Sequence, residues 1–409
     1  MLFPRVQFMV CLMAFTGSLA AQEAIFRNVD AQRNATQMRG MVEQMPYTTR
    51  WKDLRLQVGA SLGVEWNDNV RLQETSPEDD FIFTPRVDFH AFHPIGEANI
   101  FTVDLGVGYR AYISADDLDQ LIVSPGSTIS YSMYVKEIQI NFHNRMSYQV
   151  DPALVGAVSN TGEYGGLDNS LGFLVNVPLN RGSVSVGYDW VKFISVTSEF
   201  DYLDRDSHPT FARAGMLVHP AVTTGVEVSV TPTLYEDSPF NDNVNYSAGL
   251  YAHWQVSDVL YLEPRGGYTV TAFEANEFSD PSDYGSFYFG LRMDHRPNET
   301  VNYHLDIDKG VQSGVNATLS DTLRSRLSAT WSVIRDFPLS TSLFYELGKE
   351  QRGVNAEEYD RYGGDVGISY RLMEQMNARL VYALIYKNSD LPNRDYLQNR
   401  VTLNVSYRF

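Results

Sequence analysis

The sequence predicts an all-β fold in which about eighteen antiparallel strands close into an up-and-down barrel. Three observations lead to this prediction. Apolar and polar residues alternate with period two in segments of roughly ten residues, as in strands with one apolar face. The connections between these segments are alternately short and long. The last segment keeps its alternation up to the final residue, Phe409, so the chain ends within a predicted strand.

The first alternating segment, residues 54–66, illustrates the pattern. Leu56 and Leu62 belong to its apolar set, whereas Arg55, Gln57 and Glu65 belong to its polar set. The same alternation recurs to the end of the chain. The predicted strands are Leu54–Trp66, Phe81–Ala91, Ile100–Ile113, Ser124–Val135, Ile138–Val150, Leu167–Val177, Ser183–Ile194, Thr210–Val218, Val222–Tyr235, Tyr246–Val256, Val259–Thr271, Ser286–Asp294, Val301–Val311, Thr322–Val333, Leu339–Gly348, Tyr362–Leu372, Asn377–Tyr386 and Tyr396–Phe409.

The connections indicate which end of the barrel is which. Long polar loops such as "NDNVRLQETSPEDD" and "DPALVGAVSNTGEYGG" alternate with short turns. The short turns are expected at His93–Ala98, Lys136–Glu137, Pro178–Gly182, His219–Ala221, Ser257–Asp258, Arg296–Thr300, Arg335–Pro338 and Met373–Gln375. Barrels of the bacterial outer membrane have long external loops and short periplasmic turns. An even number of strands then places both termini in the periplasm.

Composition favours a membrane barrel over a large soluble β-sandwich or β-helix, the main alternative. Hydrophobic residues make up 44% of the chain, but they are spread evenly over short segments. Beyond the N-terminus they form no run long enough for a membrane-spanning helix. Closure is needed because an open sheet edge would leave backbone groups unpaired in lipid. The net charge of −18 argues against a nucleic-acid partner, since phosphates would be repelled. We therefore expect the outer membrane of a Gram-negative bacterium, with membrane lipid and lipopolysaccharide as neighbours.

The N-terminal residues do not alternate. Residues 1–20 combine an early Arg5, an apolar run and small residues up to Ala20, which predicts a cleaved secretory signal peptide. Cleavage would remove Cys11 and leave a mature chain without cysteine. Residues 21–52 are expected to be a periplasmic segment, partly helical or disordered, or else a helix that enters the barrel mouth. Residues 53–409 are expected to form the barrel.

The C-terminal strand is expected to pair with the first strand and close the barrel. Its apolar set includes Val405, Tyr407 and Phe409. These residues resemble the C-terminal signal that the outer-membrane barrel-assembly machinery reads, which makes that machinery an expected partner.

The opening hairpin, "VGASLGVEWNDNVRLQETSPEDDFIFTPRVDF", has a Gly-rich strand, an acidic/Asn pair, a loop and an acidic residue before Phe-Ile. The residues in question are Gly59, Gly63, Asp68, Asn69, Val70, Asp80, Phe81 and Ile82. In this hairpin the chain resembles the β-barrel porin 2 family; elsewhere it matches in strand rhythm and in its C-terminal strand. The resemblance implies an outer-membrane barrel encoded with exopolysaccharide-export systems, including those linked to exosortase sorting.

If the apolar set faces lipid, the polar set faces the interior, and it is rich in charge. The expected pore-lining arginines are Arg55, Arg86, Arg110, Arg145, Arg213, Arg265, Arg292, Arg324, Arg326, Arg371, Arg379, Arg400 and Arg408. The expected pore-lining carboxylates are Glu65, Asp88, Asp104, Asp189, Glu227, Glu263, Asp294, Asp306, Asp308, Glu346 and Asp365. A barrel of this width is too wide for side chains to fill, so water is expected inside.

Three interpretations of these charges stay open. The arginines and acids could pair around the wall and stiffen it. They could form an arginine ladder that guides an anionic polymer such as an acidic polysaccharide. They could instead stand opposed across the pore and orient small solutes. The long loops carry further acids, which are either a solvated surface or ligands for Ca²⁺ or Mg²⁺ shared with lipopolysaccharide; no metal site is predicted.

Catalysis is not expected. His90, His143 and His304 belong to the polar set, but the sequence shows no Ser-His-Asp spacing, metalloprotease motif or nucleotide-binding loop. No cofactor is expected either. The leading prediction is an aqueous channel associated with export of an extracellular polysaccharide. The alternatives are a general or substrate-selective porin for small solutes, and a structural surface barrel that does not conduct.

Overall fold

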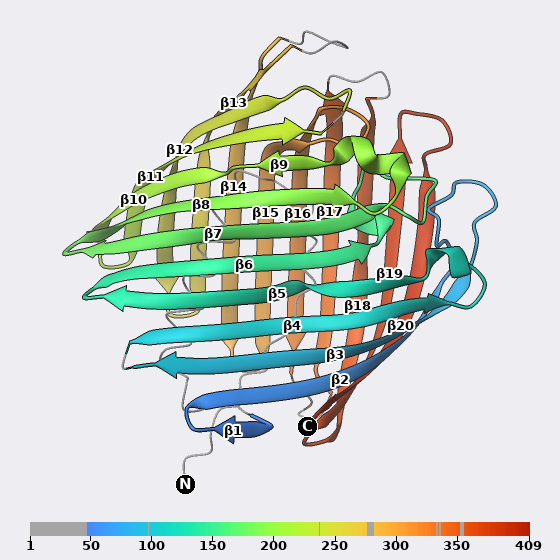
Figure 1. Ribbon diagram of the computed structural model, residues 1–409, viewed down its shortest axis with the longest axis horizontal. Coiled ribbons are helices and arrows are strands. Elements are labelled where there is room, and N and C mark those ends of the chain that lie inside the picture. The colour runs from blue at the N-terminus through green and yellow to red at the C-terminus, as the bar shows by residue number, and fades with distance from the viewer. Residues whose placement is uncertain are drawn as a thin grey trace.

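The computed structural model confirms the predicted fold class, a closed antiparallel barrel of eighteen strands (Figure 1). The structure describes residues 47–96, 98–236, 238–275, 282–332, 334, 337–351 and 356–409. The predicted signal peptide and residues 21–46 of the predicted periplasmic segment lie outside these ranges. Of that segment's last residues, Thr49–Trp51 form a short strand, β1, which pairs with β2.

All the predicted strands are present, with ends that differ by a few residues. The wall strands are β2 Leu54–Asn67, β3 Asp80–Ile95, β4 Asn99–Tyr112, β5 Gln120–Val135, β6 Ile138–Val150, β7 Gly165–Leu179, β8 Gly182–Ser195, β10 Thr210–His219, β11 Val222–Tyr235, β12 Asn243–Ser257, β13 Leu260–Phe273, β14 Tyr284–Asn298, β15 Val301–Ser313, β16 Leu319–Trp331, β17 Leu339–Gln351, β18 Glu358–Met373, β19 Met376–Ser389 and β20 Tyr396–Arg408. A short strand β9, Arg205–Ser207, bridges β8 and β11 beyond the end of β10. Within the described residues, the loops contain the 3₁₀ turns η2 Asp116–Leu118, η3 Pro152–Leu154 and η4 Ser198–Leu203.

The boundary difference at the start of β5 has a local cause. Strand β5 begins at Gln120, four residues before the predicted start, because the strand continues through an irregularity at Ser124-Pro125-Gly126. The pairing of β5 with β6 shifts between Val123 and Ser127. Gly126 has φ +147°, which suits a residue without Cβ at a bulge.

The last strand closes the barrel against the first. Ala60 pairs with Tyr407 and Leu62 with Val405. The backbone N–H of Phe409 donates to Val58 O at 3.0 Å, so the ladder extends to the final residue. Closure leaves no unpaired edge, as a sheet surrounded by lipid requires.

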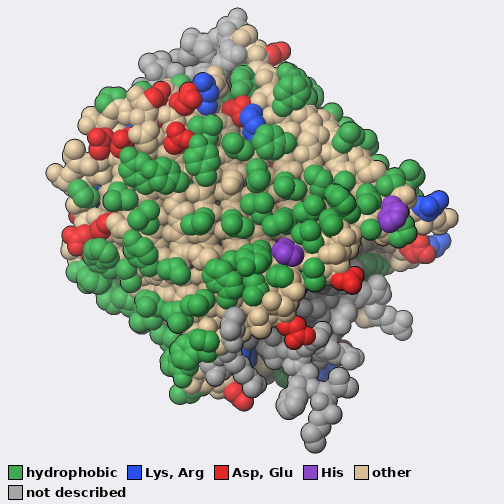
Figure 2. Space-filling model, turned by 180° about the vertical axis from the view of Figure 1, so that it is seen from behind, with side chains coloured by type: hydrophobic (Ala, Val, Ile, Leu, Met, Phe, Trp, Pro, Cys, Tyr) green, Lys and Arg blue, Asp and Glu red, His purple; other side chains and the backbone are tan. Residues whose placement is uncertain are grey.

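The outer face is apolar and the charges lie elsewhere. Figure 2 shows one side of the barrel with hydrophobic side chains over its middle and Lys, Arg, Asp and Glu mostly near its borders. Phe287, Leu250 and Leu343 are between 62% and 72% exposed there. Such exposure of large apolar side chains is costly in water and favourable in lipid. Within the described residues, no helix is long and apolar enough to cross a membrane.

The expected alternation of connections is present. The chain returns over short turns at one end of the barrel and over longer loops at the other. We number the long loops in chain order. Those used below are L1 (68–79), L3 (151–164), L4 (196–209) and L7 (314–318).

Candidate functional site

Loop L3 crosses the interior of the barrel. It leaves β6 and returns into β7, but it is attached to the opposite wall, at β18 and the loop after β19. Arg361 Nη1 donates to Ala153 O at 2.8 Å. Ser159 Oγ donates to Arg394 O at 2.8 Å, and Lys387 Nζ donates to Ser159 Oγ at 2.9 Å. L3 is therefore held at both of its halves by the far wall.

The root of L3 is also held by charge. The Asp151 carboxylate lies 3.3 Å from Arg400 Nη1 and 3.8 Å from Arg110 Nη1. Its Oδ1 also accepts from Ala153 N, which caps the η3 turn. Burial alone would raise the pKa of Asp151, but the charges of Arg400 and Arg110 outweigh it and hold the pKa below its ordinary value of 3.8.

The middle of L3 rests on a buried cluster around Glu346. Arg361 Nη2 lies 2.9 Å and Arg324 Nε 3.5 Å from Glu346 Oε2, and Tyr359 donates to Glu346 Oε1 at 2.8 Å. Gly156 of L3 approaches this cluster so closely that a Cβ there would lie 2.4 Å from Glu346 Oε1. The absence of a side chain at residue 156 is what allows the contact.

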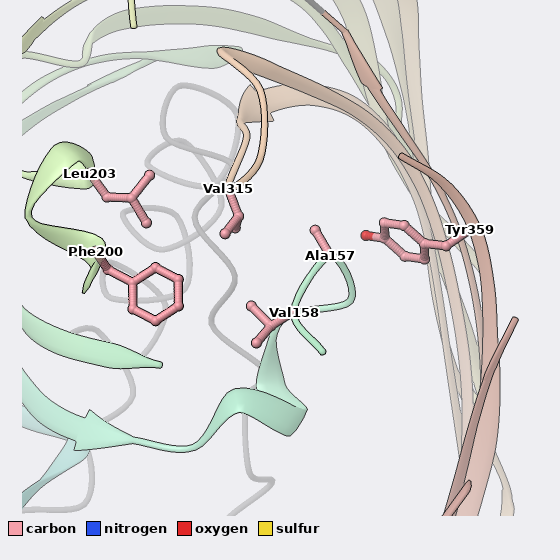
Figure 3. Packing of buried hydrophobic residues seen from close by; sticks show 6 residues of the cluster. All are labelled: Ala157, Val158, Phe200, Leu203, Val315 and Tyr359. Atoms are coloured by element: carbon pink, nitrogen blue, oxygen red, sulfur yellow. The ribbon is translucent and has the colours of Figure 1, made fainter. Parts of the chain in front are cut away.

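Loops L4 and L7 meet L3 in the middle of the barrel. Figure 3 shows Ala157 and Val158 of L3 between Phe200 and Leu203 of η4 on one side and Tyr359 of β18 on the other, with Val315 of L7 beside them. These six residues form one buried apolar cluster.

Hydrogen bonds join the same three loops. Asn316 Nδ2 donates to Ala157 O at 3.0 Å, and Tyr202 donates to Val315 O at 3.2 Å. Glu350 of β17 accepts from Val315 N and Asn316 N at 2.9 and 3.0 Å, which fixes L7. The loops thus form a packed constriction inside the barrel.

A cavity remains beside the constriction. Its volume is about 90 Å³, and it lies between the long-loop ends of β6, β7 and β8, the loops L3 and L7, and strands β15 to β18. Its lining includes Asp168, Phe193, Gln312, Glu350 and Tyr359. Asp168 and Phe193 are register partners on β7 and β8.

A second buried charge cluster lies on β10, β11 and β13. Arg213 Nε is 3.1 Å from Glu227 Oε2, and Arg213 Nη2 is 3.8 Å from Glu263 Oε1. The Arg213 guanidinium also stacks on Tyr251, with 3.8 Å to the ring centroid. Glu227 and Glu263 are each 1% exposed, so their charges depend on these partners.

Most of the remaining expected pore-lining residues also occur in pairs. Those with ion-pair partners are Arg86 with Asp88 (3.1 Å), Asp104 with His90 (2.7 Å), Arg145 with Asp189 (3.8 Å), Arg265 with Asp308 (2.5 Å), Arg292 with Asp306 (3.3 Å), Asp294 with His304 (2.9 Å) and Glu65 with Arg110 (3.9 Å). Asp365 accepts from Ser342, and Arg379 donates to Ser340 Oγ at 3.0 Å. Arg326 lies 5.7 Å from the ring centroid of Phe344, and Arg55 lies 5.9 Å from that of Tyr47. Arg371 and Arg408 are exposed near the short-turn end.

One Ser, His and Asp do come together, on β6, β7 and β8. His143 Nε2 lies 2.7 Å from Asp189 Oδ1, and Ser170 Oγ donates to the same oxygen at 2.8 Å. His143 Nδ1 faces Asn141 Oδ1 at 3.0 Å. Both ring nitrogens therefore face other groups, and the serine donates to the carboxylate rather than to the imidazole that would activate it in a Ser-His-Asp nucleophile. Among the described residues, no group of three or more His, Cys, Asp or Glu could hold a metal ion.

Two residues that hold the constriction, Arg361 and Tyr359, lie outside the predicted strands. The predicted strand begins at Tyr362, whereas β18 begins at Glu358 and contains both. Extending the alternation back from Tyr362 places both on the inner face. The predicted polar loop L3 also has an apolar set, Leu154, Val155 and Val158.

Comparisons with known proteins add a general likeness. No protein-family model matches the chain, so the resemblance to the β-barrel porin 2 family stays a prediction. No curated protein matches either. Among solved structures, OpdL of Pseudomonas aeruginosa is 12% identical, with 88% of this chain and 100% of that one covered and a TM-score of 0.48. OccK2 (OpdF) of P. aeruginosa, solved with glucuronate, is 11% identical, with 88% and 98% covered and a TM-score of 0.49. OpdK of P. aeruginosa, solved with vanillate, is 11% identical, with 87% and 99% covered and a TM-score of 0.48.

Proposed function

We propose that this protein is an outer-membrane channel that passes small solutes through a constriction formed by L3, L4 and L7. The closed barrel and its apolar outer face support the membrane location. The observation on which the proposal mainly rests is the attachment of L3 to the wall opposite its own strands. An anchored loop across the interior narrows the path to a fixed size.

This geometry favours the small-solute alternative over the leading sequence prediction, export of a polysaccharide. A polymer has to thread past the narrowest point as a continuous chain. To make room, L3 would have to leave both Arg361 and the carboxylate cluster at Glu346. The hydrogen bond from the Arg361 guanidinium to Ala153 O would be lost, at about 1.5–3 kcal/mol for a bond to a charged group, and the apolar contacts with Phe200 and Leu203 would be lost as well.

The expected pore-lining residues then take two roles. Arg110, Arg324 and Arg400 contribute to the anchoring of L3. Pairs such as Arg86 with Asp88 and Arg292 with Asp306 keep partly exposed polar groups on the wall and would present both signs of charge to a passing solute. This arrangement is closer to opposed charges that orient small solutes than to an unbroken arginine ladder.

The test is conductance of the refolded chain in planar bilayers, with neutral sugars of increasing length added to one side. We expect steady conductance that small sugars enter and long oligosaccharides do not. A variant that lacks residues 155–162 should conduct more and admit longer sugars, because the loop is removed while its strands remain. A shorter deletion in loop L1, of the exposed residues 74–77, controls for loop shortening as such.

Two results would overturn the proposal. Wild-type passage of long acidic oligosaccharides would restore the polymer-export interpretation. Absence of conductance from a chain shown to be folded would leave a structural role.

A further inference from the structure

The cavity beside the constriction has hydrogen-bond acceptors that no described residue satisfies. Gln312 lines it, is 9% exposed, and has its Oε1 buried without a hydrogen-bond partner. A buried acceptor without a donor costs about 1–3 kcal/mol. A ligand that brings a donor to this atom would recover that cost.

Asp168 supplies a second acceptor, with a charge. It lies on the inner face of β7, is half-buried and lines the same cavity. No hydrogen bond or ion pair joins its carboxylate to another part of the described chain. Its register partners are Ser147 on β6 and Phe193 on β8, and neither is cationic.

The balance of charge around the cavity is negative. Asp168 and Glu350 face it against one cationic side chain, Arg205. Asp151 also lines it, but its charge is paired with Arg400 and Arg110. Arg205 lies over the ring of Phe193 at 4.6 Å and donates to Leu203 O at 2.9 Å, so it is turned toward the protein as well as the cavity. Glu350 accepts from three N–H groups of L7, which are neutral donors and leave its charge in place.

The arginines of the far wall do not change this balance. Arg361, Arg324 and Arg400 pair with Glu346 or Asp151 behind L3, and none of the three lines the cavity. L3 thus separates the arginine-rich wall from the cavity. Among the groups that line the cavity, the Asp168 carboxylate and Gln312 Oε1 are acceptors without a hydrogen bond, and Phe193 and Tyr359 line the same cavity.

We propose that this cavity is a binding site for the ammonium group of a small cationic solute, with Asp168 as its counter-ion and Gln312 Oε1 as a second acceptor. An ammonium offers several N–H donors and one positive charge, which matches the open acceptors. The alkyl part of the solute would lie against Phe193. The inference rests on the proposed channel function and names the class of solute that the channel selects.

Three probes with the same four-carbon chain test the site: 1,4-diaminobutane, butane-1,4-diol and succinate. Each is added to a planar bilayer that contains the refolded full chain, and block of the K⁺ current is titrated. We expect the diamine to block and the diol and succinate to block much less. Asp168→Asn should weaken the diamine block about two- to tenfold, the range for one partly buried ion pair. Asp116→Asn, the same change at an exposed site in η2, should leave it unchanged.

A second variant and a binding measurement also test the site. Gln312→Met removes the second acceptor at similar volume and should also weaken the block. If Asp168→Asn does not fold, Gln312→Met decides alone. Equal block by all three probes, or a diamine block unaffected by both variants, would overturn the inference while the channel function stands. If the folded chain does not conduct, the channel function fails, and calorimetric titration with 1,4-diaminobutane still shows whether the cavity binds it.

Discussion

At the scale of single residues, Tyr359 connects the wall to the constriction. Its ring covers Gly348 on β17, where a Cβ would lie 2.1 Å from Tyr359 Cζ, and it abuts Gly156 of L3. Its hydroxyl bonds Glu346, and Lys387 lies 5.0 Å from its ring centroid. The two glycines leave room for one large aromatic residue, which packs against L3 on one side and the strand on the other.

Gly156→Ala should therefore loosen the constriction. A Cβ at this residue meets Glu346 Oε1 at 2.4 Å and Tyr359 Cε2 at 2.5 Å, so L3 has to move away from the wall. We expect a loss of about 1–3 kcal/mol in stability, typical of overpacking, with larger or noisier single-channel currents. Gly266→Ala adds the same methyl group where the nearest atom is 3.5 Å away and should change neither. Wild-type currents from Gly156→Ala would show that L3 does not set the pore size.

At the scale of elements, the strands could be predicted and the constriction could not. A strand with one apolar face and one polar face shows its period directly in the sequence. The bounds of β6 and β11 therefore equal the predicted ones. L3 has no period, because its conformation depends on partners such as Arg361 and Tyr359, which lie about 200 residues away along the chain. Its apolar residues indicate that the loop packs against other apolar residues. The sequence alone does not identify these partners, because only closure of the barrel brings them close.

Protonation of Asp151 in strong acid should also destabilise the docked conformation of loop L3. The pKa of this carboxyl is held below 3.8 mainly by Arg400 and Arg110, against the opposing effect of burial. A depressed pKa means that the charged form stabilises the docked loop above pH 3.8, and that this stabilisation fades as the pH falls through the lower folded-state pKa. We expect constant conductance from neutral pH to about pH 4 and larger, fluctuating currents below it. In Asp151→Asn the currents should already fluctuate at neutral pH; a steady Asp151→Asn channel would contradict this role.

At the scale of the whole molecule, the barrel wall is one sheet whose outer surface is apolar and whose inner surface is charged. The outer face carries large exposed apolar side chains, whereas the inner face carries paired charges and the folded-in loops. Because successive residues of a strand point to opposite faces, each wall strand contributes to both surfaces. The effect of a substitution on stability therefore depends on its position along the strand and on the face to which its side chain points.

A charge placed on the outer face should test this arrangement by depth. Leu250 is the middle residue of β12 and 65% exposed, and Val256 lies on the same face near the short turn, 39% exposed. Leu250→Arg should cost about 2–4 kcal/mol and Val256→Arg about 0–1 kcal/mol, because the cost of a cation falls from the bilayer midplane to the interface. Guanidinium unfolding of the chain refolded into lipid vesicles, followed by tryptophan fluorescence, measures both. Equal costs at the two depths would mean that this face of β12 does not lie in a bilayer, and the membrane location itself would have to be given up.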